Sequence, residues 1–280
     1  MSETGTLARV GRDGALRLDF ERRGPVTVLA RSRSTLPLQV LAPVALEDQA
    51  AIVSILNPTG GLVGGDRLTV DVTVGPTAHA CLTTPSATKV YRSEGEPARQ
   101  DVTLRLEAGA ACEWVPDHTI PFAGSALRQR ITVDVGDGAR LILVDAFAAG
   151  RVGRGERWAF RLLDSAIVLR DAKGWLLRDR FVLDGSGSLN PEGLGVTEGR
   201  PYFASLVVVA DDVEGFRREV AARFPAGAVV IAAAGRLPRR GALVRCLAPS
   251  APALLTALDV LWAAARRHGL GLPPLSLRKG

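Results

Sequence analysis

The sequence is poor in the residues on which metal cages and covalent catalysis depend. Its 280 residues include only three cysteines and three histidines, and none follows a spacing such as Cys-x-x-Cys or His-Glu-x-x-His. The odd, widely spaced set Cys81, Cys112 and Cys246 is typical of a reducing compartment rather than a disulfide framework. No Gly-x-Ser-x-Gly elbow presents a nucleophile. We therefore expect no enzyme activity and no tightly bound cofactor.

Long apolar runs and aromatic residues are also scarce, the latter at 5% of the chain. No run approaches membrane-spanning length, and no basic segment followed by an apolar stretch opens the chain, so we expect a cytoplasmic protein without membrane association. The net charge of +6 comes from arginines scattered among strand residues, which predicts no nucleic-acid groove. With 47% hydrophobic residues, the chain can bury one core, and we expect a single domain over 1–280.

Alternation of apolar and polar residues dominates the chain from about residue 14 to residue 210. Short alternating segments between turn signals predict a mostly β body. Similar turns, each followed by an alanine that starts a new strand, recur about thirty residues apart at 74–78, 106–110 and 135–139. This weak repeat predicts a stacked-sheet, helicoidal architecture like a β-solenoid, in which each unit covers the apolar face of its neighbour.

The pattern changes after Tyr202. Two segments with helical spacing and capping residues follow, at about 211–224 and 250–268. We expect an α+β element with two helices, over about 206–268, that is attached to the β body and is not an independent domain. Residues 269–280 are expected to form an extended tail with exposed leucines, of the kind that docks on another surface.

Three segments, at 57–66, 83–93 and 113–122, are the most informative part of the sequence. The first is a glycine loop that ends in Asp66 and opens a strand instead of a helix, which argues against a phosphate-binding loop. Together, and in this order, they resemble the signature stretches of the urease accessory protein UreD (UreH) family. We refer to them as the signature segments.

This resemblance implies a non-catalytic scaffold in urease maturation. It implies binding to apo-urease and to a UreF-type accessory protein, which in turn recruits a UreG-type GTPase that delivers nickel. It also implies that nickel passes transiently through an internal polar tunnel and is not held tightly, because an ion bound too strongly would not move on.

Five residues are candidates for such a passage: Asp66, Glu113, Asp117, His118 and Asp145. Asp66 ends the glycine loop, where it either lines a passage or bonds nearby backbone amides as a turn aspartate. Glu113 precedes a proline turn that presents Asp117 and His118, which either face a groove or form a solvated loop tip. Asp145 ends an apolar strand at 141–144.

Other readings of the sequence stay open at this point. His79 and Cys81 lie two apart on an expected strand, so they share a face and form either half of a nickel or zinc site or a half-buried pair without metal. His268 closes a helix and is given no site role. Two alternative functions are a β-solenoid enzyme that acts on carbohydrate through a carboxylate pair and a structural adaptor without metal passage.

Overall fold

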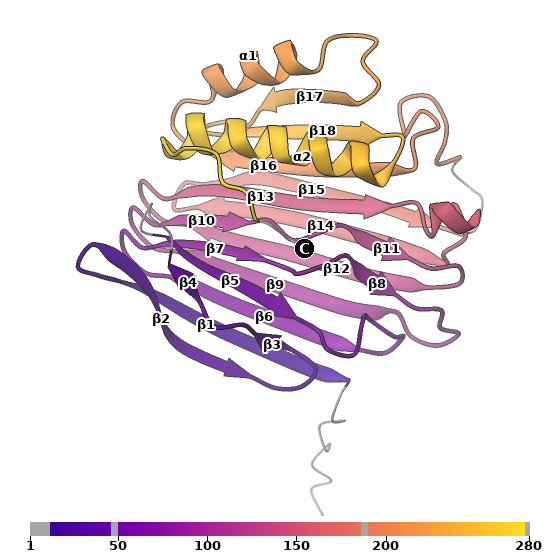
Figure 1. The fold of residues 1–280 in the computed structure, drawn as a ribbon, viewed down its shortest axis with the longest axis horizontal. Helices are drawn as coiled ribbons and strands as arrows, with labels where there is room; N and C mark the ends of the chain where they lie inside the picture. The colour runs from indigo at the N-terminus through magenta and orange to yellow at the C-terminus, as the bar shows by residue number, and fades with distance from the viewer. Residues whose placement is uncertain (1–11, 46–49, 186–189, 278–280) are drawn as a thin grey trace, which may run out of the picture.

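The computed structural model describes residues 12–45, 50–185 and 190–277. The strands form two stacked β-sheets, and the two α-helices lie toward one end of the stack, with α2 across the front (Figure 1). This confirms the mostly β, stacked-sheet body with two helices late in the chain. None of the helices in the described ranges is long and apolar enough to cross a membrane.

The first sheet has seven strands in the order β15-β14-β12-β9-β6-β1-β2. Their bounds are Asp13–Arg23 (β1), Val26–Ser34 (β2), Arg67–Val74 (β6), Ala98–Leu106 (β9), Ala126–Val135 (β12), Leu162–Asp171 (β14) and Gly174–Asp184 (β15).

The second sheet has the order β17-β18-β16-β13-β10-β7-β5-β3, with β4, β8 and β11 paired beside this path. Its strands are Gln39–Val40 (β3), Val44–Ala45 (β4), Ala51–Leu56 (β5), His79–Thr83 (β7), Thr88–Val90 (β8), Ala111–Trp114 (β10), Thr119–Pro121 (β11), Arg140–Ala148 (β13), Tyr202–Val209 (β16), Ile231–Arg236 (β17) and Ala242–Ala248 (β18).

The expected repeat forms the centre of the stack. In three successive units the chain runs along the first sheet, turns, and continues in the second sheet as β6–β7, β9–β10 and β12–β13. Equivalent strands pair in parallel, and the turns stack as well: the N–H of Thr77 donates to the carbonyl of Ala108 at 3.1 Å, and that of Gly109 to the carbonyl of Asp137 at 2.8 Å. The repeating turn sequence is therefore a stacking motif.

The main core lies between the two sheets. One row of side chains crosses five strands of the first sheet in register and is fully buried: Leu18, Val72, Leu104, Val133 and Leu169. Burying one such side chain contributes roughly 1.5–3 kcal/mol. The period-two alternation of the sequence is what places these residues on one face.

The late α+β element continues the second sheet, because β16 pairs antiparallel with β13. Helix α1 spans Glu214–Arg223 and α2 spans Ala251–Ala265, followed by a π-helical turn at Arg266–Leu270; a short 3-10 turn lies earlier, at Val152–Arg154. Ser250 caps α2 by accepting a hydrogen bond from the N–H of Ala253 at 3.3 Å. A second core fills the space between α2 and the sheet.

The end of the chain differs from the expected exposed tail. Leu270 is buried, and Leu272, Leu275 and Leu277 are half-buried against the second core. Two arginines hold this segment: Arg140 donates to the carbonyl of Leu270, and the Nε of Arg266 donates to the carbonyl of Pro273, both at 2.8 Å. These leucines therefore cover this chain's own core. Residues 278–280 lie outside the described ranges.

Candidate functional site

The three signature segments lie side by side at the edge of the molecule where strands β6, β9 and β12 begin. Leu62 of the first segment exchanges backbone hydrogen bonds of 2.8 Å with Lys89 and Tyr91 of the second. Strand β8 of the second segment pairs in parallel with β11 of the third, and the ring of Tyr91 meets that of Phe122 edge to face at 5.2 Å. Segments far apart in sequence thus form one continuous layer.

The glycines of the first segment are required because this layer is packed backbone to backbone. A Cβ at Gly61 would lie 2.4 Å from the carbonyl oxygen of Lys89. A Cβ at Gly64 would lie 1.7 Å from the Ser93 hydroxyl and 2.8 Å from the carbonyl oxygen of Glu96. At Gly61 and Gly64 the loop can therefore approach its neighbours only without a side chain.

A cavity of about 200 Å³ lies between the two sheets and is lined by all three signature segments. Its exposed lining residues include Pro58 and Ser86, and Asp117 lines it as a half-buried residue. Its buried lining residues include Gln129 and Asp145. The cavity therefore leads from the signature segments to a polar group deep between the sheets.

Asp145 is the central ionisable group of this cavity. Its carboxylate accepts hydrogen bonds from Gln129 Nε2 at 2.8 Å and from the Ser165 hydroxyl at 2.9 Å. Burial raises the pKa of Asp145 to about 6, although the bonds from Gln129 and Ser165 oppose the rise. The pKa of this buried carboxyl group is therefore closer to neutral pH than that of an exposed aspartate.

The partners of Asp145 were not among the candidates found in the sequence. Gln129 shares the inward face of β12 with the buried residues Leu127 and Ile131. Ser165 is likewise an inward, buried polar residue on β14. A polar residue at an inward position of an alternating strand is the signal that could have identified both.

Polar groups continue across the second sheet beyond Asp145. In register, Asp145 on β13 is followed by Ser205 on β16 and Arg245 on β18. Arg245 donates to the Ser205 hydroxyl at 2.5 Å and forms an ion pair with Asp179 of the first sheet. The side chain of Arg245 is half exposed, so this polar row reaches from the cavity to the surface.

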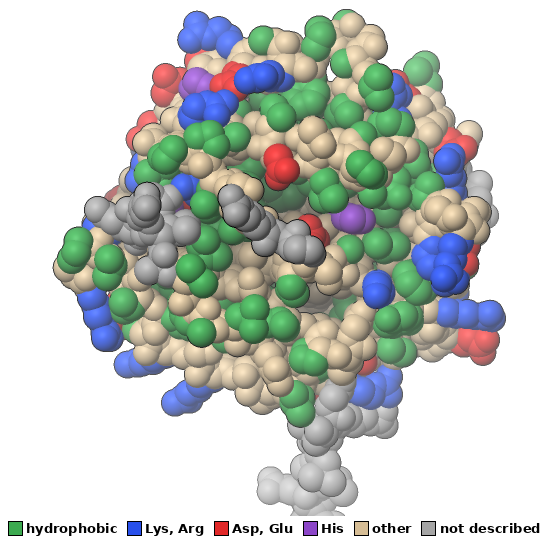
Figure 2. All heavy atoms as spheres, in the orientation of Figure 1, with side chains coloured by type: hydrophobic (Ala, Val, Ile, Leu, Met, Phe, Trp, Pro, Cys, Tyr) green, Lys and Arg blue, Asp and Glu red, His purple; other side chains and the backbone are tan. Residues whose placement is uncertain are grey.

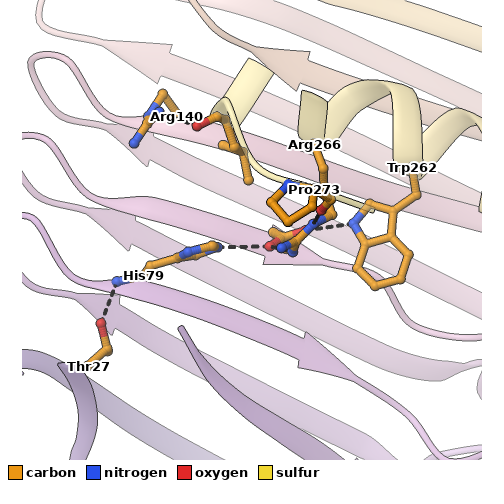
Figure 3. A network of polar contacts seen from close by, with 8 residues as sticks. Thr27, His79, Arg140, Trp262, Arg266 and Pro273 are labelled. Carbon is orange, nitrogen blue, oxygen red and sulfur yellow. Dashed lines mark hydrogen bonds and ion pairs between the residues drawn. The ribbon is translucent and has the colours of Figure 1, made fainter. Parts of the chain in front are cut away.

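Glu113 alternates along β10 with Cys112 and Trp114 of the inter-sheet core, so it lies on the opposite face of the second sheet, toward α2. Figure 3 shows its partners His79, Trp262 and Arg266. Glu113 is fully buried and accepts hydrogen bonds from Trp262 Nε1 at 2.6 Å and from His79 Nε2 at 2.8 Å. Arg266 completes the network through an ion pair with the same carboxylate. His79 and Cys81 share a face, as the spacing predicts, and Cys81 is the register partner of Glu113. This network ties α2 to the sheet.

The remaining candidates lie in three different environments. The Asp66 carboxylate accepts the N–H of Val63 at 2.7 Å and closes the glycine loop without lining the cavity. Asp117 lines the cavity, whereas the adjacent His118 packs its ring against Tyr202, with centroids 6.1 Å apart. The structure therefore brings Asp117 and Asp145 to one cavity and places Asp66, Glu113 and His118 elsewhere.

The described residues that line the cavity offer oxygen atoms and include no histidine or cysteine. Within the described ranges, no three His, Cys, Asp or Glu side chains come together in a way that could hold an ion. Burial raises the pKa of the Cys112 thiol far above its ordinary range and that of Cys246 to about 12, so neither supplies a thiolate ligand near neutral pH. What the cavity offers is carboxylate and amide oxygen.

The outer surface on the side of the second sheet is rich in apolar side chains. Figure 2 shows hydrophobic side chains spread across this face, with most Lys and Arg residues toward its rim.

Fold and site together define a two-sheet helicoidal scaffold with a polar cavity between its sheets. The model of the UreD urease accessory protein family matches residues 12–279. The chain therefore belongs to the UreD family, whose members serve in urease maturation and are not enzymes.

Individual relatives agree with this assignment. The chain is 38% identical over 266 residues to the urease accessory protein UreD of Alkalilimnicola ehrlichii, covering 94% of this chain and 89% of the relative. It is 36% identical over 287 residues to the urease accessory protein UreD of Deinococcus radiodurans, covering both chains completely. To the urease accessory protein UreD of Haloarcula marismortui it is 33% identical over 273 residues, covering 96% of this chain and 91% of the relative.

Proposed function

We propose that this chain is a urease maturation scaffold that acts in the cytoplasm and passes nickel through the inter-sheet cavity. In this proposal it binds apo-urease and a UreF-type accessory protein, and a UreG-type GTPase joins through that complex. The observation that carries the nickel path is the placement of Asp117 and Asp145 in one cavity lined by the signature segments.

The chemistry of the cavity suits an ion that must keep moving. Carboxylate oxygens bind Ni²⁺, but two carboxylates among amide and hydroxyl groups do not form a closed coordination shell. Since the pKa of Asp145 is about 6, the carboxylate is ionised at neutral pH and still close to the point of protonation. Nickel therefore competes with a proton and with the hydrogen bonds from Gln129 and Ser165. Each of these competitors favours release.

The test is urease activation in cells that lack their own copy of this protein. They receive the wild type, Asp145→Asn, Asp117→Asn or both changes, and Asp134→Asn serves as the matched control. Asp134 is a carboxylate on the outer face of the first sheet, paired with Arg170 and outside the cavity lining. Urease activity and the nickel content of purified urease are measured, together with co-purification of the accessory complex.

We expect Asp145→Asn to lower urease nickel content, the double variant to lower it further, and the control to match the wild type. The complex should co-purify in every case, because neither change opens a large cavity in the core. Full nickel loading by the double variant, with the complex intact, would refute passage through the cavity. It would support the alternative function, a structural adaptor without metal passage.

A further inference from the structure

The outer face of the seven-stranded sheet carries a row of three arginines side by side. Arg67 on β6, Arg99 on β9 and Arg128 on β12 are directly in register, and all three are exposed. Neighbouring strands are about 4.8 Å apart. Like charges directly opposite on adjacent strands destabilise a sheet. We call these residues the arginine row.

Several other charges on the same face are matched by a charge of opposite sign. Arg105 pairs with Asp71 at 3.3 Å on adjacent strands, and Arg170 pairs with Asp134. Arg180 donates two hydrogen bonds to Asp164, at 2.8 and 2.9 Å. Arg17 on β1 and Arg33 on β2 also stand directly opposite each other on this face, with Asp19 at 3.9 Å from Arg17. The arginine row differs from this pair because it extends over three strands.

Two aspartates flank the arginine row in register, Asp13 beside Arg67 and Asp164 beside Arg128. Arg128 lies 3.9 Å from Asp164, whose carboxylate already binds Arg180, and Arg99 lies 3.8 Å from the exposed Glu96. Among the described residues, no hydrogen bond or ion pair involves the side chain of Arg67. Most N–H donors of these three guanidinium groups therefore face solvent.

The row also has a defined position relative to the candidate site. Strands β6, β9 and β12 run in parallel, and all three begin at the edge of the molecule where the signature segments lie. Arg67 directly follows Asp66, and the N–H of Arg99 donates to the carbonyl of Asp66 at 2.8 Å. A partner bound to the arginine row would therefore lie close to the signature segments, which line the cavity.

We propose that the arginine row is a docking site for an acidic polypeptide segment of a partner protein. The guanidinium fork binds carboxylates through two parallel hydrogen bonds, and a row of such forks fits a row of Asp or Glu side chains. Carboxylates placed there would also remove the repulsion within the row. The inference goes beyond the nickel path and does not depend on it.

The surroundings favour acidic protein over nucleic acid. Sheets that bind single-stranded nucleic acid stack bases on aromatic side chains. The exposed aromatic residue of this sheet is Trp175, which lies at the opposite ends of the strands against Arg178, 5.1 Å from its guanidinium carbon. Among the residues that the structure describes, no exposed aromatic side chain lies beside the row.

The test compares two triple variants with the same loss of charge. Arg67→Gln, Arg99→Gln and Arg128→Gln remove the row, whereas Arg105→Gln, Arg170→Gln and Arg180→Gln remove arginines of the same face that are already paired. The full chain is titrated against a fluorescent decaglutamate peptide and against single-stranded polyuridylate, and the anisotropy is followed at two salt concentrations. Thermal unfolding reports the folding of both variants.

We expect the row variant to lose roughly tenfold or more of its affinity for decaglutamate, and the control variant to lose much less. The row variant should unfold at the same or a higher temperature than the wild type, because removing the row relieves repulsion. Equal losses in both variants would show general charge attraction and overturn the proposal. Tighter, row-dependent binding of polyuridylate than of decaglutamate would also overturn it, in favour of nucleic acid.

Discussion

The substitution Asp145→Asn provides a physical test of the cavity that requires no partner protein. Asparagine has the same shape and can still accept a hydrogen bond from Gln129 and donate one to Ser165, but it carries no charge and does not titrate. In the wild type, burial raises the pKa of Asp145 from its ordinary value of 3.8 to about 6. At neutral pH the ionised, buried carboxylate therefore lowers the free energy of unfolding of the wild type, and the variant lacks this loss.

The size and sign of the effect follow from this shift. A pKa that is higher in the folded state contributes stability below the unfolded value, and this contribution is lost as the pH rises through the folded value. A shift of about two units corresponds to about 3 kcal/mol, at 1.36 kcal/mol per unit. We therefore expect the free energy of unfolding of the variant, relative to the wild type, to rise by up to about 3 kcal/mol between about pH 4 and pH 7.

Urea denaturation of both purified proteins across this pH range measures the difference directly. Ionisations that both proteins share cancel in the comparison, so the pH dependence of the difference reports Asp145 alone. Asp134→Asn is the control, because Asp134 forms a surface ion pair with Arg170. A variant that is less stable than the wild type at pH 7, or a difference that does not change with pH, would refute the assignment of Asp145 as a strained, buried acid.

Three further substitutions test the rest of the architecture by urea denaturation. Glu113→Gln leaves Arg266 buried without its counter-ion and should cost about 3–5 kcal/mol, and a loss below 1 kcal/mol would show that the network does not hold α2. Gly64→Ala should lower the free energy of unfolding by more than about 2 kcal/mol. The control Gly95→Ala, whose Cβ would meet no atom within 4 Å, should change it by less than about 0.5 kcal/mol. Similar values for the two variants would contradict the tight packing of the loop. Ser250→Ala should cost about 1 kcal/mol through loss of the α2 cap, and no loss would mean that solvent replaces the hydroxyl.

The features predicted from the sequence are those that depend on local patterns. Alternation placed the buried faces of the strands, the recurring turns indicated the stacked units, and the cap at Ser250 marked the start of α2. Each of these depends on residues a few positions apart. The resemblance of the signature segments to UreD was equally local, although their assembly into one layer became apparent only in the structure.

The environment of each candidate could not be predicted because it depends on distant partners. Glu113 and Trp114 are adjacent, yet alternation along β10 sends Trp114 to the inter-sheet core and Glu113 toward Arg266, far along the chain. Asp145 obtains its hydrogen bonds from two other strands, and its pKa depends on their register. The sequence predicts that the leucines near the end of the chain dock on a partner, but in the structure they pack against the second core of the same chain.

The most direct test of nickel passage is a transfer experiment in the presence of a chelator. Purified complexes of this chain with apo-urease and the UreF-type protein receive a UreG-type GTPase loaded with nickel, and excess EDTA captures any ion that enters solution. Nickel in urease is then measured for the wild type, Asp145→Asn and the control Asp134→Asn. Passage through the cavity predicts EDTA-resistant loading by the wild type and the control, and a loss of loading by Asp145→Asn. Loading that EDTA abolishes in the wild type, or that Asp145→Asn supports in full, would contradict it.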